Sequence, residues 1–562
     1  DEKSAYLYLD TARRKQVSGD LGGAVTMYEK FLKIFPRHAS ALQLAGTAYL
    51  LYHKPEKAAK ALERATILSP KNADAHFNLG LAYAQIGKKH KSIKSYRTAI
   101  NLDPNLGDAY FNLGRIYFTD ENYAEAISLY LKALEINPSD FQCRVNLGNA
   151  YTRSSGTDPK LWHLAWREYE KALQINPNIA EAYGNIGALF RSVDWHSLAI
   201  PFYDLAMKVD PANQEHRFIR SGLALSLGDF ETGWDDYEAR SRFGKKNIRR
   251  RPVPPHYWNG EDLKGKRLLI WREQGLGDQI IFSSMIRHVL DLGAHVTLDI
   301  HPRLAKVFAR SFPGVELLKD TAEGESEIKK PNLFDYQIAL GSLGRFFRRR
   351  FEDFPRHQGY IKADPDKVAR FRAKYQALAK GNRLVGISWQ SKREGRFGEL
   401  KSAPLMEWAE ILRTPDVTFV NLQYGDCRAE LADVKKNLGI EIYQDTDVNS
   451  MGDLDDFVAQ VAALDLVLST SNTTVHVAGS LNVPCWIMPP RGGALLWYWF
   501  LERTDNPWYP SVKLYRPLRF EDLSDRAKVL ANWWIAPLGR MARDLSAWRS
   551  SAVPDASPMQ PA

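Results

Sequence analysis

The chain has 562 residues, of which 44% are hydrophobic, and a formal net charge of +10, enough apolar material for three or four domains with their own cores. No stretch approaches the roughly 18 consecutive apolar residues that cross a bilayer, so we expect no membrane insertion and a cytoplasmic protein. The cysteines Cys143, Cys427 and Cys485 lie too far apart for a disulfide framework or a zinc site, which favours a reducing compartment.

A period of 34 residues runs through the first part of the chain, marked by Leu-Gly pairs at Leu79, Leu113 and Leu147. Each unit closes with a proline, which ends a helix because it has no N–H to donate. These prolines are Pro36, Pro70, Pro104, Pro138, Pro177 and Pro211. Helical hairpins of this length bury their apolar faces only by stacking on one another. The sequence therefore predicts an array that binds a partner.

The spacing of small and large residues resembles the tetratricopeptide repeat over residues 5–213, and we predict six units in a first domain of residues 1–213. Asn78, Asn112, Asn146 and Asn185 share position 6 of their units, on the helix that lines the groove. A side-chain amide has one acceptor and two donors, so four in register can hold an extended polypeptide by its backbone. The alternative is that asparagine is simply common at this position in such repeats.

Residues 214–251 are expected to form capping helices followed by a basic linker, Lys245–Arg251. A second basic run contains Arg345, Arg348, Arg349 and Arg350. Such runs can bind nucleic acid or anionic lipid, but neither is accompanied by a nucleic-acid motif. We therefore expect a solvated linker, an exposed helix end and no nucleic-acid partner.

Strands and helices alternate from residue 252 onwards, which predicts parallel sheets in two α/β domains, residues 252–380 and 381–540. A disordered tail is expected at 541–562. In the first half we expect strands at Lys266–Trp271, Ala294–Ile300 and Asp335–Ala339, with helices at Gln279–Leu292 and from Arg303. In the second half we expect strands at Arg383–Trp389, Val417–Leu422, Asp465–Thr470 and Val483–Met488, with helices at Pro404–Leu412 and from Thr473. Ligands of such sheets bind beyond the carboxyl ends of the strands.

The turn after the first strand contains Gly275, Gly277 and Asp278. Glycine lets the backbone approach a ligand, and the following helix N-terminus attracts an anion. Asp278 is either a carboxylate aimed into the cleft or the N-cap of that helix.

The matching turn of the second half, Ser469–Gly479, places hydroxyl and amide side chains at a helix start, which favours a phosphate cradle. His476 lies one turn into this helix and is either a contact to the same anion or a core histidine. Asp453, Asp455 and Asp456 are interpreted as helix-capping residues rather than metal ligands. We predict no metal site.

These two turns and the segment Pro507–Pro510 resemble a bacterial tetratricopeptide protein fused to a heptosyltransferase-type glycosyltransferase. The resemblance implies a GT-B fold with two Rossmann-like halves and a nucleotide-sugar donor, with no metal and no cofactor. It also implies that Asp278 is the general base, and Glu273 is the reserve candidate. Candidate donor-binding residues are Gly275, Gly277, Gln390, Lys392, Arg393, Lys401, Asn472, Thr473, Thr474 and His476. One departure is Ser471-Asn472, where heptosyltransferases commonly have Asp-Thr.

A tetratricopeptide array joined to such a transferase also resembles the eukaryotic protein O-glycosyltransferase of intracellular Ser and Thr, and bacterial flagellin glycosyltransferases. The resemblance implies a protein O-glycosyltransferase that transfers a sugar, such as a nonulosonic acid, to an acceptor such as flagellin held by the four asparagines. Two alternatives remain open, a non-catalytic scaffold with a degenerate transferase domain and a lipopolysaccharide sugar transferase.

Overall fold

The computed structural model describes residues 2–154, 158–241, 256–273, 275–318, 333–391, 398, 400–517 and 533–549. The basic linker Lys245–Arg251, Lys392 and Arg393 lie outside the described residues. The chain divides into two compact units, Asp1–Asn185 and Ile186–Ala562. Within the described ranges, no helix is long and apolar enough to cross a membrane.

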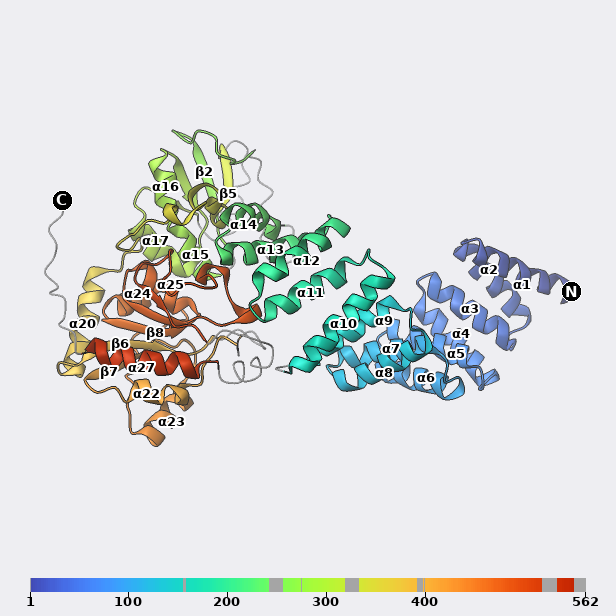
Figure 1. Cartoon of the computed structure of the whole chain (residues 1–562). Coiled ribbons are helices and arrows are strands. Elements are labelled where there is room, and N and C mark those ends of the chain that lie inside the picture. Colours follow the sequence, from blue (N-terminus) through green and yellow to red (C-terminus); the bar gives the residue numbers. More distant parts are fainter. Residues whose placement is uncertain are drawn as a thin grey trace. The chain divides into compact units, whose positions relative to one another are not determined.

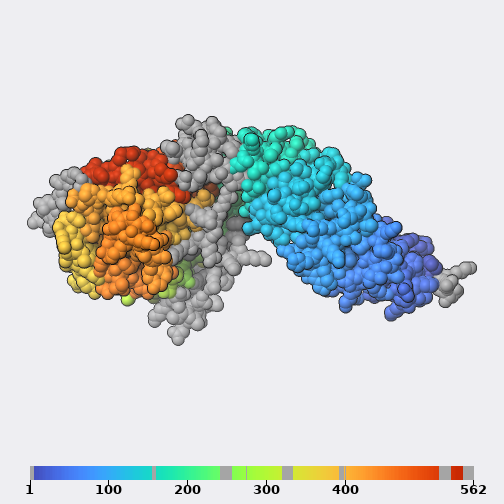
Figure 2. Space-filling model, turned by 90° about the horizontal axis from the view of Figure 1, so that it is seen from below, coloured from blue at the N-terminus to red at the C-terminus, as the bar shows by residue number. Residues whose placement is uncertain are grey.

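The first unit is entirely helical and consists of consecutive antiparallel hairpins (Figure 1). Its helices are α1 (Glu2–Val17), α2 (Leu21–Ile34), α3 (Ala39–Leu51), α4 (Pro55–Leu68), α5 (Ala73–Gln85), α6 (Lys89–Leu102), α7 (Gly107–Thr119), α8 (Tyr123–Ile136), α9 (Phe141–Ser154), α10 (Pro159–Ile175) and the first part of α11 (Ala180–Ser192). In Figure 2 these hairpins form one continuous surface from blue to teal. The predicted helical array is confirmed.

The two helices of a hairpin pack closely because a glycine on one helix faces a tyrosine on the next. A Cβ atom on Gly80 would lie 2.6 Å from the Tyr96 ring, and one on Gly114 would lie 2.8 Å from the Tyr130 ring. Both tyrosines are buried. The glycine of each Leu-Gly pair therefore leaves the space into which the large residue of the partner helix fits.

The second unit holds two parallel sheets of five strands, as predicted for an α/β region in two halves. The order in the first sheet is β1-β5-β2-β3-β4, and in the second β10-β9-β8-β6-β7. The strands are β1 (His256–Tyr257), β2 (Arg267–Trp271), β3 (His295–Leu298), β4 (Glu316–Leu317), β5 (Tyr336–Ala339), β6 (Arg383–Ser388), β7 (Val417–Asn421), β8 (Leu466–Thr470), β9 (Cys485–Met488) and β10 (Val512–Leu514). Of these, β1, β4 and β10 were not expected from the sequence, because they are only two or three residues long.

In each sheet the order of strands changes direction beside the first long strand. This change lies between β2 and β5 in the first sheet and between β6 and β8 in the second. Such a switch point opens a crevice at the carboxyl ends of the two strands, where ligands bind. Helix α15 (Leu276–Ser283) follows β2 and helix α25 (Thr473–Ser480) follows β8. The two turns singled out in the sequence therefore occupy the switch points of the two sheets.

The expected helix Gln279–Leu292 is divided into α15 and α16 (Ile286–Asp291). The hydroxyl groups of Ser283 and Ser284 donate to the carbonyl oxygens of Ile280 and Ile281, at 2.7 and 2.8 Å. Serine hydroxyls that bind the backbone in this way compete with the helical hydrogen bonds. We attribute the break to this pair of serines.

Helices α12 (His196–Val209), α13 (Gln214–Leu227) and α14 (Phe230–Tyr237) belong to the compact unit that contains the sheets (Figure 1). The buried Trp234 of α14 packs 6.4 Å from the Phe282 ring and 5.2 Å from the Trp497 ring. Gly344 permits this approach, since a Cβ there would lie 2.3 Å from the Trp234 ring. The boundary between the two compact units thus falls within α11, whereas the sequence pattern places the end of the array at residue 213.

The second half ends in helix α27 (Ile535–Arg549). The prediction of a disordered tail is therefore wrong for residues 541–549. Met541, Ala542 and Leu545 are buried in one cluster with Trp408 and Ile411. Removing this apolar face from water stabilises the helix, although the surrounding sequence is polar.

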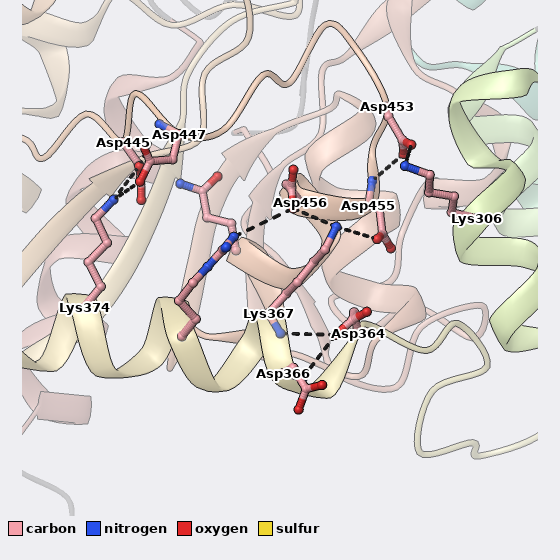
Figure 3. Close-up of polar contacts among 12 residues, drawn as sticks. Lys306, Asp364, Asp366, Lys367, Lys374, Asp445, Asp447, Asp453, Asp455 and Asp456 are labelled. Atoms are coloured by element: carbon pink, nitrogen blue, oxygen red, sulfur yellow. Dashed lines mark hydrogen bonds and ion pairs between the residues drawn. The ribbon is translucent and has the colours of Figure 1, made fainter.

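An ion-pair network joins α17 (Ala305–Ser311) of the first half to α20 (Pro365–Ala379) and α24 (Asp455–Ala462) of the second (Figure 3). The Asp453 carboxylate accepts from the Asp455 N–H at 2.9 Å and meets the Lys306 ammonium at 2.8 Å. Burial alone would raise the pKa of Asp455, but hydrogen bonds from Lys367 and Arg310 hold that pKa below its ordinary value. The N-cap of α24 is Leu454, so the capping interpretation holds only for the bond that Asp453 accepts, whereas Asp455 and Asp456 pair with Lys367.

Candidate active site

Helices α15 and α25 bring the two switch points into contact. A Cβ on Gly277 would lie 2.6 Å from Cδ2 of His476, so only glycine allows α15 to approach α25 this closely. The N-terminal turns of both helices, with their outward N–H groups, therefore lie at one place between the two sheets.

Asp278 is the third residue of α15, and the N-cap of this helix is Gly275. The N-cap interpretation of Asp278 is therefore wrong in its literal form, although the Gly275 N–H donates to the Asp278 carboxylate. Burial, and after it the negative charge of Glu273, raise the pKa of Asp278 to about 6. A carboxylate with this pKa is well suited to accept a proton near neutral pH.

Glu273 is only 5% exposed and is bound on several sides. Its carboxylate accepts from the Arg240 guanidinium at 2.7 Å and from the Gly341 N–H at 2.9 Å. Arg240 also donates to Ser342 Oγ at 2.9 Å and lies over the Tyr237 ring, 4.1 Å from its centre. Glu273 is thus a structural ion-pair partner whose charge acts on Asp278, which makes it a poor candidate for the base.

Arg240 was missed as a site residue in the sequence. It lies at the end of the expected capping helices, and nothing in its spacing connects it with Glu273. The structure brings the two together because the 3-10 helix Glu238–Ser241 packs beside the start of α15.

Asn472 is the N-cap of α25 and connects β6 with β8. Its Oδ1 accepts from the Thr474 N–H at 3.1 Å, and its Nδ2 donates to Ser388 Oγ at 2.8 Å and to the Gln390 carbonyl at 3.3 Å. The Gln390 side chain donates to both oxygens of Glu430 at 2.7 Å. Both amides thus hold the switch point in shape, and the Gln390 side chain is directed to α23 (Arg428–Leu438) rather than to α25.

Two buried hydroxyl groups lie at the start of α25, those of Thr470 and Thr474. Within the described part of the chain, neither has a hydrogen-bond partner. Buried polar groups are rarely left without a partner, so each is a ready donor to an anion at this helix N-terminus. Thr470 was not among the expected site residues, while Thr473, half-buried at the first helical position, was.

His476 does not act as a cation here. Its Nδ1 lies 2.9 Å from the Tyr509 hydroxyl, and its ring stacks on Trp499 at 5.4 Å. Burial, and secondarily the charge of Lys401, lower the pKa of His476 to about 3. The imidazole is therefore neutral, and it packs as a core histidine between α15 and α25.

Lys401 is 6% exposed, and its charge acts on both Asp278 and His476. Lys392 and Arg393, the other predicted cations, lie outside the described residues.

A cavity of about 360 Å³ opens beside Asp278. Its walls are the Glu273–Arg240 pair, the α13 residues Ser221–Leu223 and the segment Gly492–Tyr498. All of these belong to the second compact unit. The residues of α25 expected to hold the donor are not among the described residues that line it.

The four asparagines of the array are half-buried. Asn112 and Asn146 each donate to the carbonyl oxygen four residues earlier, at 2.8 Å, while Asn78 donates to Thr47 and Asn185 to Asn149. Each amide has a second donor and an acceptor oxygen besides. Asn112 also lines a groove pocket of about 510 Å³.

The second basic run is paired rather than free. Arg345 meets Asp235 at 3.6 Å, Arg349 meets Glu231 at 3.5 Å and Arg350 meets Asp353 at 3.4 Å. Arg348 was expected at an exposed helix end, but it is buried against Phe354 and Trp508, and burial lowers its pKa to about 10. The run is thus largely used within the fold. Separately, the described residues contain no group of three His, Cys, Asp or Glu side chains that can hold a metal ion.

Comparison with known proteins shows that the chain contains tetratricopeptide repeats, as predicted. Models of the tetratricopeptide repeat match residues 73–106 and 107–140, and a model described as TPR repeat matches residues 54–87. Protein FlbA of Caulobacter vibrioides is 34% identical over 362 residues. This match covers 62% of the chain and 60% of the length of that relative.

Among solved structures, the chain is similar to MamA protein, at 28% identity and a TM-score of 0.29 over 32% of this chain and 94% of that one. It is also similar to pilF of Pseudomonas aeruginosa, at 23% identity and a TM-score of 0.33 over 36% of this chain and 90% of that one. Each likeness covers about a third of this chain.

Proposed function

We propose that the chain is a metal-independent glycosyltransferase that transfers a sugar from a nucleotide-sugar donor to Ser or Thr of a protein held by the repeat array. One observation carries the proposal: a half-buried carboxylate with a raised pKa, Asp278, lies where the two sheets' switch points meet. The resemblance to heptosyltransferase-type enzymes supports this assignment. The resemblance to flagellin glycosyltransferases supports flagellin as the acceptor and a nonulosonic acid as the sugar.

The proposed reaction is a displacement at the anomeric carbon. Asp278 takes the proton of the acceptor hydroxyl, whose oxygen forms the bond to the anomeric carbon. The bond from this carbon to the donor phosphate oxygen breaks, and its electron pair stays on the phosphate. The N–H groups at the start of α25, the hydroxyls of Thr473 and Thr474, and the ammonium of Lys401 stabilise the charge of this leaving group.

The competing function is a scaffold whose transferase half has lost its chemistry. The Ser471-Asn472 departure favours it, because the amide of Asn472 is engaged with Ser388, Gln390 and Thr474. The raised pKa of Asp278 opposes it, since an unused buried carboxylate only destabilises the fold.

The test is a panel of CMP-, UDP-, GDP-, ADP- and TDP-sugars incubated with the full chain and flagellin. We expect one nucleotide to raise the melting temperature and the corresponding sugar to appear on flagellin in its intact mass. A nucleotide that stabilises the chain without transfer to any protein would support the scaffold instead.

The asparagines of the array give a separate prediction. Replacing Asn112 and Asn146 together by alanine is expected to raise the acceptor dissociation constant about tenfold, since each lost hydrogen bond costs about 0.5–1.5 kcal/mol. The measurement is titration of labelled acceptor, with donor hydrolysis as the second readout, which we expect to be unchanged.

The matched control replaces Asn101 and Asn178, two exposed asparagines of the same unit outside the shared position. It is expected to leave the dissociation constant unaltered. If the Asn112 and Asn146 variant binds acceptor as tightly as the control, the asparagines do not hold the polypeptide.

A further inference from the structure

The cavity beside Asp278 is a compartment of its own. It is lined by α13, by the Glu273–Arg240 pair and by Gly492–Tyr498, while the donor-cradle residues of α25 lie outside its described lining. The acceptor hydroxyl must reach the Asp278 carboxylate, while its oxygen also reaches the anomeric carbon of the donor. The cavity supplies a second approach to Asp278.

Gly222 of α13 keeps this compartment open. A Cβ on Gly222 would meet no atom within 4 Å, and the residue has no positive φ angle. In the middle of a helix, glycine costs roughly 0.5–1 kcal/mol relative to alanine. Neither backbone geometry nor crowding therefore requires glycine here, and its effect is to leave space in the cavity.

The opposite wall is anchored firmly. The Gly492 N–H donates to Asp194 at 2.7 Å, and the Arg491 guanidinium meets the same carboxylate at 2.9 Å. Gly492 has a φ of +64°, and a Cβ there would lie 2.7 Å from the Ser192 carbonyl oxygen. The wall cannot retreat without breaking these buried contacts, so the width of the cavity is set by Gly222.

The chemistry of the walls limits what fits. Apart from Asp278, the charged side chains of the lining are the Arg240–Glu273 pair, which neutralise each other, and Arg191. Leu223, Leu495 and Trp497 make much of the remaining wall apolar. A volume of about 360 Å³ is at the small end of ligand pockets.

We propose that this cavity is the acceptor subsite and that Gly222 determines its size limit. The proposal rests on the proposed function. The subsite takes a Ser or Thr side chain together with small neighbouring residues of an extended segment. Acceptor sites flanked by large residues are excluded.

The first experiment compares Gly222→Ala and Gly222→Leu with Gly539→Leu, a control in α27 whose Cβ would make only ordinary contacts at 3.9 Å. Gly222→Leu is expected to lower kcat/KM for the protein acceptor at least about tenfold, because the leucine side chain takes up space that the acceptor segment needs. The kcat/KM of Gly222→Ala should lie between those of Gly222→Leu and the native chain, and the kcat/KM of Gly539→Leu should equal that of the native chain. Donor hydrolysis without acceptor is the reference rate.

The second experiment needs no variant. Peptides with serine between two alanines or between two tryptophans are offered to the native chain, and the alanine peptide is expected to be modified faster. Equal rates for the two peptides, or full acceptor activity of Gly222→Leu, would overturn the subsite while leaving the transferase function intact. Absence of transfer by the native chain with every donor would overturn both.

Discussion

Replacing Asp278 by asparagine is expected to lower kcat for sugar transfer by about 10²–10⁴, the usual contribution of a positioned general base. Asparagine retains an oxygen that accepts from the Gly275 N–H, so the start of α15 should keep its shape. Acceptor binding should therefore be unchanged. Initial rates with saturating donor, together with acceptor titration, measure both quantities.

The pH dependence of sugar transfer by the native chain should reflect the same group. Because the pKa of Asp278 is raised to about 6, the carboxylate needed as base is lost below that pH. We expect kcat/KM to rise with pH through about 6, and this limb should be absent from the residual activity of the asparagine variant. A residual limb at the same pH would assign the titration to another group.

As the pH rises, the stability of the native chain should fall while its transfer activity rises. A carboxyl group whose pKa is raised in the folded state favours folding at low pH, and this contribution is lost as pH rises from 3.8 through about 6. The asparagine variant should therefore melt above the native chain at pH 8. Lower stability of the variant at pH 8, with activity falling only in proportion, would show that Asp278 is structural.

The second large effect concerns the buried pair of Arg240 and Glu273. Replacing Arg240 by methionine is expected to cost about 3–5 kcal/mol, because it leaves a buried carboxylate without its cation. Glu273→Gln should cost a similar amount for the converse reason. The double variant should recover much of the loss, and chemical denaturation of all three measures the coupling.

The matched control is the exposed pair of Lys435 and Glu441, whose side chains are 65% and 75% exposed. Lys435→Met should change stability by about 0–1 kcal/mol. If Glu273→Gln instead folds normally and loses turnover, Glu273 is the base and the structural assignment fails.

Secondary structure could be predicted well where periodicity was strong. The hairpins follow from their repeated Leu-Gly pairs and prolines, and long strands such as β6 and β8 follow from continuous apolar runs. Short strands such as β10 carry no such signal, because pairing with β9 defines them rather than local preference. Helix α27 was missed for the same reason, since the core that covers it comes from distant parts of the chain.

The candidate site, too, could be predicted only in part from the sequence. Its position was predictable, because turns rich in glycine and hydroxyl residues after buried strands lie at the carboxyl ends of a parallel sheet. The roles of the individual residues could not be predicted. His476 and Glu273 have chemically suitable side chains, yet one is neutral in an aromatic core and the other is neutralised by Arg240.

The repeat array, the two α/β halves and the two turns that hold the candidate residues were predictable, because these depend on local spacing and hydrophobic pattern. Which of those residues are accessible and charged depends on the three-dimensional fold. The pKa of Asp278, the pairing of Glu273 and the cavity at Gly222 all arise from segments far apart in the chain. Burial and Coulomb interactions depend on distances in space, which residue spacing does not contain.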